Sequence, residues 1–136
     1  MGRQFTIPNR EVEEWIELSV EMVDDWDESH EIPGRFGRLV DEDGGPYAVW
    51  VELNPRTVLE EHYHTENQWQ IFIEGSCTMH GEELTPTTVH YADKGTPYGP
   101  IAAGDDGVTF LTLREKAPTG YHPVDRDGSL ETGSGD

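Results

Sequence analysis

The chain has 136 residues, of which 28 are acidic and 9 are basic, giving a formal net charge of −19 at pH 7. This length suits one domain with a real core. So acidic a chain is repelled by nucleic acid and by anionic membranes, and we expect neither as a partner. No run approaches the roughly 18 apolar residues of a membrane span. The single cysteine, Cys77, permits no intrachain disulfide, which favours a cytoplasmic location.

The first third of the chain holds few strong signals. Residues 1–33 are predicted to form an N-terminal arm and an acidic loop that precede the main domain. Within them, residues 14–18 alternate in part between polar and apolar side chains, which fits either a strand or a helical turn. The acidic stretch DDWDESHE, residues 24–31, is typical of a solvated loop.

The main domain is predicted at residues 34–116, where short runs of β-forming residues alternate with turns rich in glycine and proline. Strands are expected at residues 36–40, 47–53, 58–64, 68–74, 77–79, 87–91 and 108–114. Short strands at this spacing are typical of an all-β jelly-roll sandwich or barrel. Residues 117–136 are predicted to be an extension that packs back at 121–123 and ends in a disordered tail.

The strand at 68–74 has two different faces. Because side chains alternate along a strand, one face carries Gln68, Gln70 and Phe72, and the other carries Trp69, Ile71 and Ile73. If the first face lines a pocket, the second is apolar and needs cover, which another sheet, a terminal arm or a second subunit could supply. We expect a homodimer, since large exposed apolar patches usually mark interfaces.

Two histidines, His62 and His64, lie one residue apart on a predicted strand. The period of two places both imidazoles on one face, and imidazole is the commonest side-chain metal ligand. A turn at residues 65–67 would bring Gln68, at the start of the next strand, back over the same pocket. The alternative is that both histidines are merely polar residues at a strand edge.

This segment resembles the first motif of the cupin superfamily. That motif runs glycine, five residues, His-x-His, three or four residues, glutamate, six residues, glycine. The corresponding positions here are Arg56, His62, His64, Gln68 and Gly75. The spacing fits throughout, but Arg56 replaces the first glycine and Gln68 replaces the glutamate.

The second cupin motif is degraded. It runs glycine, five residues, Pro-x-Gly, two residues, histidine, three residues, asparagine. The corresponding positions are Thr87, Asp93, Gly95, Tyr98 and Ala102. Only Gly95 is retained, and Tyr98 stands where the last metal-ligating histidine normally lies. The resemblance covers residues 34–114 and implies a cupin-type jelly-roll barrel, also called a double-stranded β-helix.

In cupins that match both motifs, three histidines and a glutamate hold a transition metal. The resemblance therefore implies His62 and His64 as metal ligands, with Gln68 and Tyr98 at the other two positions. We expect a divalent metal, with iron favoured over Mn, Ni or Zn. A neutral glutamine supplies no charge compensation, which should weaken affinity. Tyr98 could be a phenolate ligand, a neutral hydrogen-bond donor or catalytic acid–base group, or an aromatic residue that fills a metal-free barrel.

The resulting hypothesis is a metal-dependent, dioxygenase-like enzyme that acts on a small carbonyl or aromatic substrate. Its predicted substrate-binding residues are Gln70, Phe72 and His90. The alternative is a metal-free cupin that binds or senses a small molecule without catalysis, since loss of the glutamate and the last histidine is what such a protein would show. A structural dimer with an empty barrel is a third possibility.

Overall fold

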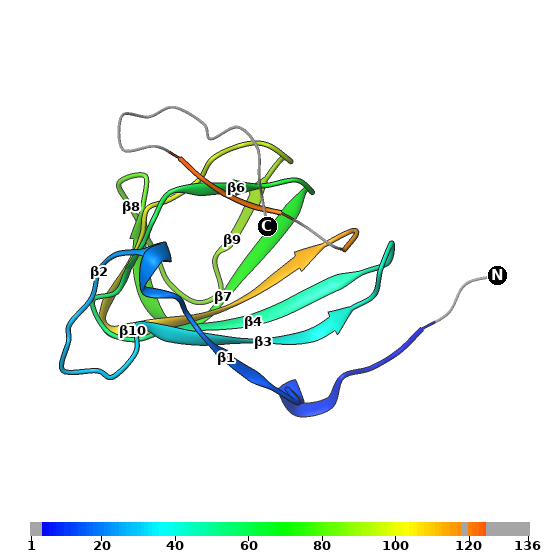
Figure 1. Cartoon of the computed structure of the whole chain (residues 1–136), viewed down its shortest axis with the longest axis horizontal. Coiled ribbons are helices and arrows are strands. Elements are labelled where there is room, and N and C mark those ends of the chain that lie inside the picture. The colour runs from blue at the N-terminus through cyan, green and yellow to red at the C-terminus, as the bar shows by residue number, and fades with distance from the viewer. Residues whose placement is uncertain (1–3, 118–119, 125–136) are drawn as a thin grey trace.

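A computed structural model describes residues 4–117 and 120–124, and it is built almost entirely from antiparallel strands (Figure 1). The strands are β1 (Trp15–Glu17), β2 (Val23–Asp25), β3 (Gly34–Asp41), β4 (Tyr47–Leu53), β5 (Val58–Leu59), β6 (His62–His64), β7 (Gln68–Met79), β8 (Glu82–Leu84), β9 (Val89–Ala92), β10 (Ile101–Arg114) and β11 (Tyr121–Pro123). Short 3₁₀ turns lie at Pro8–Arg10 and Val20–Met22. The predicted all-β class is confirmed.

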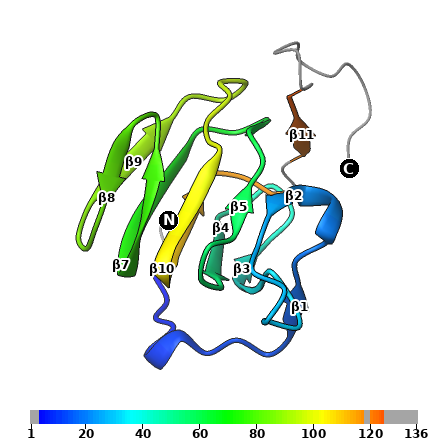
Figure 2. The same cartoon turned by 90° about the vertical axis from the view of Figure 1, so that its left-hand side faces the viewer.

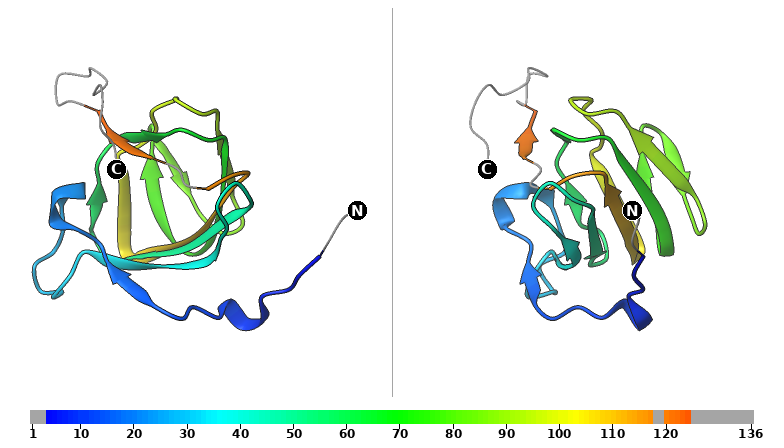
Figure 3. Two further views of the ribbon diagram at one scale, coloured as in Figure 1. Left: turned by 45° about the vertical axis from the view of Figure 1, so that its right-hand side comes forward. Right: turned by 90° about the vertical axis from the view of Figure 1, so that its right-hand side faces the viewer.

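Strand β10 connects the other strands of the barrel wall, because it pairs with three of them. Its C-terminal part, Val108–Arg114, is paired antiparallel with β4 on one side and with β7 on the other. Its first residues, Ile101 and Ala102, pair with β5 in place of β4, while Ala102 and Ala103 still pair with β7. The paired strands curl into a barrel, which Figure 3 shows from two further sides. This is the predicted jelly-roll type of barrel.

Both termini add strands to this framework. Strand β1 pairs with β3, so residues 14–18 contain a strand and no helical turn. Strand β2 pairs with β5, so part of the predicted acidic loop also belongs to the sheet. At the other end β11 pairs with β6, which brings Tyr121 opposite His64 and agrees with the predicted packing of 121–123 on the barrel. The tail predicted from residue 127 lies outside the described residues.

The sequence predicts separate strands at residues 68–74 and 77–79 with a turn at Gly75 between them, and this is wrong, because β7 runs without a break from Gln68 to Met79. Gly75 has a φ of +74°, and a Cβ atom there would lie only 2.0 Å from the carbonyl oxygen of Gly107. The pairing of β7 with β10 is interrupted at this point, between Ala103 and Val108 of β10. A close approach of two glycines thus replaces the expected turn with a bulge that bends the two strands together.

The core is apolar and is built from buried side chains of β4, β5, β7, β8, β9 and β10. Phe72 and Ile101 have no exposed surface, and the rings of Phe72 and Phe110 pack 5.2 Å apart. Burial of each such side chain stabilises the fold by about 1.5–3 kcal/mol. No helix of the described residues is long and apolar enough to span a membrane.

The outer face of β7, β9 and β10 exposes large apolar side chains. Trp69, Val89, Tyr91 and Leu113 are 51%, 53%, 42% and 37% exposed. The pairing register places Trp69 beside both Tyr91 and Leu113, so these residues form one patch. Figure 2 shows β7, β8 and β9 at one side of the barrel, away from the strands of the N-terminal segment. The predicted alternation along β7 is therefore present, with an exposed apolar outer face.

Candidate functional site

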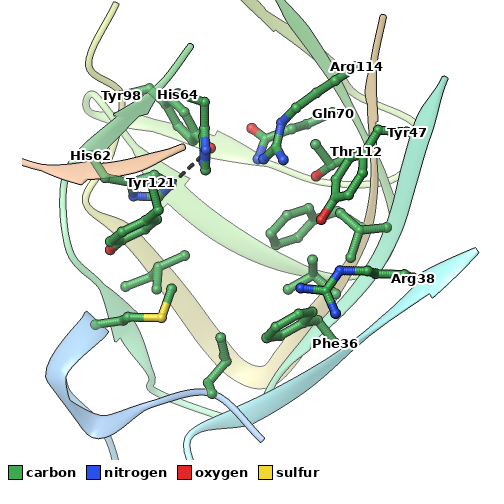
Figure 4. A pocket seen from close by; sticks show the side chains of 16 residues that line it. Phe36, Arg38, Tyr47, His62, His64, Gln70, Tyr98, Thr112, Arg114 and Tyr121 are labelled. Carbon is green, nitrogen blue, oxygen red and sulfur yellow. Dashed lines mark hydrogen bonds between the residues drawn. The ribbon is translucent and has the colours of Figure 1, made fainter. Parts of the chain in front are cut away.

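A cavity of about 350 Å³ lies inside the barrel, and Figure 4 shows the side chains that line it. Much of its wall is apolar and comes from Leu18, Met22, Phe36, Val51, Leu59 and Phe110. Four of the residues predicted for the site also line it, namely His62, His64, Gln70 and Tyr98. Five polar lining residues were not predicted: Arg38, Tyr47, Thr112, Arg114 and Tyr121.

His62 is held in one tautomer. Its Nδ1 lies 2.8 Å from the carbonyl oxygen of Glu60, and because a carbonyl only accepts, Nδ1 carries the proton. The Nε2 lone pair then accepts a hydrogen bond from the hydroxyl of Tyr98 at 2.9 Å. Burial lowers the pKa of His62 to about 4 against the opposing effect of the Glu60 carbonyl, and the charge of Arg114 adds to the lowering. The imidazole is therefore neutral at physiological pH.

His64 has the same arrangement with a different backbone partner. Its Nδ1 donates to the carbonyl oxygen of Gly120 at 2.7 Å, which leaves the Nε2 lone pair for the cavity. Burial and then the charge of Arg114 lower its pKa to about 2. The two imidazole rings are 5.0 Å apart and nearly perpendicular. The cavity thus receives two neutral imidazoles of fixed tautomer from one short strand.

Tyr98 is fixed by its backbone as well as its side chain. Its N–H donates to the carbonyl of His62 at 2.9 Å, and its own carbonyl accepts from the N–H of His62 at 3.1 Å. Burial raises the pKa of Tyr98, while the charge of Arg114 and polar contacts with Gln68 and Arg114 oppose the rise. The net direction is upward, so the phenol stays neutral. Here the Tyr98 hydroxyl donates to His62, and its predicted roles as a metal ligand and as a catalytic group stay predictions.

Arg114 and Gln68 form a pair at the end of two neighbouring strands. They lie opposite each other in the β7–β10 register, and Nε of Arg114 donates to Oε1 of Gln68 at 2.9 Å. The guanidinium carbon lies 5.0 Å from the centre of the Tyr47 ring. Gln68 is 1% exposed, and its Nε2 has no hydrogen-bond partner among the described residues. The amide oxygen predicted as a metal ligand is therefore already engaged by a cation.

Tyr121 closes the site from the C-terminal side. Its ring stacks on that of His62, with centroids 4.6 Å apart and an interplanar angle of 29°. Its hydroxyl donates to Oε2 of Glu60 at 2.6 Å. Burial and the hydrogen bond to Glu60 raise the pKa of Tyr121, so it is neutral. The only sequence signal for this residue is its place in the segment expected to pack back.

Three predicted site residues do not line the cavity. Phe72 is fully buried in the core against Phe110, and of these two rings only Phe110 lines the cavity. His90 lies on β9, where its Nδ1 donates to Oε1 of Gln70 at 3.2 Å and its ring centroid lies 5.6 Å from that of Tyr98, so it contacts two cavity residues without lining the cavity itself. Gln68 faces inward as predicted, but Arg114 lies against its amide oxygen. Both glutamines are buried, and Gln70 alone of the two borders the cavity.

No protein-family model matches the sequence of the chain, and no curated protein matches it. Many solved structures nevertheless have a similar fold. A candidate acetylacetone dioxygenase from Methylibium petroleiphilum superposes with a TM-score of 0.70 at 11% identity, covering 99% of this chain and 90% of its own. An RmlC-like cupin from Ralstonia eutropha gives a TM-score of 0.66 at 9% identity, with 98% and 80% covered. Acetylacetone dioxygenase from Acinetobacter johnsonii gives 0.59 at 11% identity, with 98% and 92% covered.

These similarities define the fold of the chain. It is the cupin-type barrel that the motif spacing indicates. At 9–11% identity the likeness does not extend to activity, and the site must be judged by its own residues.

The donor set does not fit a resident divalent metal. Among residues 4–117 and 120–124, no group of three or more histidine, cysteine, aspartate or glutamate side chains is placed to hold one. The lone pair of His62 Nε2 accepts from Tyr98, and Oε1 of Gln68 accepts from Arg114. A bound dication would meet the positive guanidinium of Arg114, and no aspartate or glutamate is among the described residues that line the cavity. The predicted metal stays a prediction that this geometry disfavours.

Proposed function

We propose that the barrel cavity binds a small organic anion without a resident metal. One observation supports this above all others. The chain carries a net charge of −19, yet the described lining of the cavity includes two of its nine basic residues, Arg38 and Arg114, and no aspartate or glutamate. A concave apolar site with a few convergent positive groups favours a ligand with an apolar body and an anionic end.

The two arginines lie at different depths. The side chain of Arg38 is 44% exposed and lies 3.5 Å from Asp41, so a ligand that pairs with Arg38 competes with an exposed carboxylate. Arg114 is more enclosed and is held by Gln68 and by the Tyr47 ring. Arginine presents a planar set of donors that matches a carboxylate, which suits recognition of planar oxyanions.

The ligand class follows from these groups. A cavity of about 350 Å³ suits a molecule of modest size, and its wall offers both apolar side chains and a neutral acceptor on His64. Two structural neighbours are named for acetylacetone, a small dicarbonyl compound that forms an enolate anion. We therefore propose a carboxylate or an enolate with a small apolar body.

A metal-dependent, dioxygenase-like enzyme is the second candidate. It is favoured by the two imidazoles, whose Nδ1–H groups donate to backbone carbonyls, as is usual for metal-ligating histidines, although a metal would have to displace the Tyr98 hydroxyl from Nε2 of His62. Metal analysis of the purified untagged protein separates the two candidates. About one metal per chain, lost in His62→Ala, would favour the enzyme.

Ligand binding is tested by calorimetry and thermal shift on metal-stripped protein. The probes are benzoate and acetoacetate, each compared with a neutral isostere, benzamide and acetoacetamide. We expect the anions alone to raise the melting temperature, as a ligand of the folded state does. Arg38→Gln should weaken benzoate binding about tenfold, equivalent to about 1.4 kcal/mol.

The matched control is Arg35→Gln, on the same strand. Arg35 pairs with Glu52 and stacks on Trp15, and it does not line the cavity. The Arg35→Gln variant removes the same charge as Arg38→Gln, so unchanged benzoate binding in it shows that the effect at Arg38 is local. Equal shifts with the anions and their neutral isosteres, or no shift with any of them, would refute the proposal.

A further inference from the structure

We propose that Arg114 takes the place of a metal ion in this barrel: its guanidinium is the permanent cation of the site, it excludes a divalent metal, and it binds an oxygen of the ligand. The exclusion of metal stands by itself. The contact with the ligand oxygen rests on the proposed anion-binding function.

The first step is the position of Arg114. It ends β10 directly opposite Gln68 on β7, and it borders the cavity with His62 and His64 (Figure 4). Its Nε donates to Oε1 of Gln68 at 2.9 Å. The side chain at the glutamate position of the first motif therefore directs its only acceptor at a cation of the protein itself.

The second step is the kind of polar atom that remains. Oε1 of Gln68 accepts from Nε of Arg114. If the amide were turned over, its NH₂ group would face the N–H of Arg114, and two donors would repel each other, so Nε2 must point away from Arg114. This Nε2 is buried and finds no acceptor among the described residues. A buried donor favours an acceptor atom beside it. A metal ion needs lone pairs, whereas the centre around Arg114 and Gln68 offers N–H groups, which suit an oxygen.

The third step is charge. A guanidinium does not lose its proton in proteins, so a change of pH cannot remove this cation. The same charge borders the cavity together with the predicted ligands His62 and His64, so it repels a dication held by them. Replacement of a carboxylate by Gln68 removes the group that would have offset it.

The experiment compares metal binding in four proteins: the wild type, Gln68→Glu, Gln68→Glu/Arg114→Met and Gln68→Glu/Arg114→Lys. Zn(II) and Mn(II) are titrated calorimetrically into stripped, untagged protein. We expect no stoichiometric binding by the first two proteins. The methionine double variant should bind about one Zn(II) per chain, at least 100-fold more tightly than the wild type, and His62→Ala in that background should abolish it.

The lysine double variant is the matched control, because it has the same new carboxylate and keeps the positive charge. It should not gain metal binding. Gln68→Glu/Arg114→Gln serves as a second neutral variant if the methionine variant fails to fold by circular dichroism. Stoichiometric metal binding by the wild type, equal binding by the lysine and methionine variants, or no gain in a folded neutral variant would each overturn the exclusion.

A second arm measures benzoate binding in Arg114→Met and Arg114→Lys with Gln68 intact. We expect Arg114→Met to lose at least tenfold in affinity and Arg114→Lys to lose less. Undiminished benzoate binding by Arg114→Met would overturn the proposed contact with the ligand oxygen. If the wild type binds no anion, the proposed function and this contact fail together, and the metal titrations still decide whether Arg114 excludes a metal.

Discussion

The hydroxyl of Tyr98 and the imidazole of His62 form the most constrained polar contact of the site. Both side chains are 3% exposed, and the backbones of the two residues are hydrogen-bonded to each other as well. His62 can only accept at Nε2, because its Nδ1–H donates to Glu60. The hydroxyl of Tyr98 is therefore a donor, and its removal leaves a buried acceptor without a partner.

Tyr98→Phe should destabilise the fold by about 1–3 kcal/mol, the usual cost of leaving a buried polar group unpaired. Urea unfolding followed by circular dichroism measures this. Tyr91→Phe is the control, because the Tyr91 hydroxyl also makes one hydrogen bond, to Asp93 at 2.8 Å, but in solvent. It should cost less than about 0.5 kcal/mol. Equal losses in the two variants would mean that the contact with His62 contributes nothing beyond an exposed hydrogen bond.

The neutral state of His62 predicts a pH dependence of stability. Its pKa is about 4 in the folded protein against an ordinary value of 6.5, so the unfolded chain binds a proton more readily. Stability from this group is therefore full above pH 6.5 and is lost as the pH falls from 6.5 toward 4. The loss should approach about 3 kcal/mol, since each pKa unit corresponds to about 1.4 kcal/mol.

His62→Gln removes this titration and should flatten the stability curve between pH 6.5 and 4 relative to the wild type. Equilibrium unfolding in urea at several pH values gives the comparison. His80→Gln, at an exposed hairpin position, is the control and should leave the curve unchanged. A His62→Gln curve parallel to that of the wild type would contradict the neutral, buried imidazole.

At the scale of elements, the bend of β7 and β10 depends on glycine at one point. Gly75 and Gly81 both have a positive φ, of +74° and +79°. A Cβ atom at Gly75 would meet the backbone of Gly107 at 2.0 Å, whereas one at Gly81 would meet nothing within 4 Å. Substitutions at Gly75 and Gly81 therefore separate two costs in stability, that of the positive φ and that of the close backbone approach.

Gly81→Ala should lose about 1 kcal/mol through its positive φ alone. Gly75→Ala should lose at least about 2 kcal/mol more, because two backbones must move apart between β7 and β10. Thermal and urea unfolding of the two variants measures the difference. Similar losses would show that the bulge tolerates a side chain and that β7 does not need glycine there.

Alternation along β6 and β7 is what made part of the site predictable. Period-two patterns place His62 with His64, and Gln68 with Gln70, whatever the rest of the fold does. The role of Arg114 could not be read in the same way, since it lies 46 residues from Gln68 and meets it only through the β7–β10 register. Gly120 and Tyr121 likewise reach His64 and His62 only because β11 pairs with β6. Long-range strand pairing therefore places Arg114 beside Gln68, so that a residue expected to bind a metal makes a hydrogen bond to an arginine.

For the whole molecule, two features of the surface have opposite effects on self-association. A net charge of −19 repels other copies of the chain, while the patch of Trp69, Val89, Tyr91 and Leu113 favours association. Outward positions on these strands are apolar over several residues, so repulsion between two copies is smallest there. The homodimer expected from the sequence remains a prediction, and this face is where it would form.

Light scattering after size exclusion should give about twice the 15.3 kDa mass of one chain, and the dimer should strengthen with added salt, which screens the repulsion. Trp69→Glu should yield a folded monomer, because it places a charge at the centre of the patch. Val20→Glu adds the same charge at a residue that is 58% exposed outside the patch, and it should leave the dimer intact. A wild type that stays monomeric at high salt, or a Trp69→Glu variant that stays dimeric, would rule out this face as the interface.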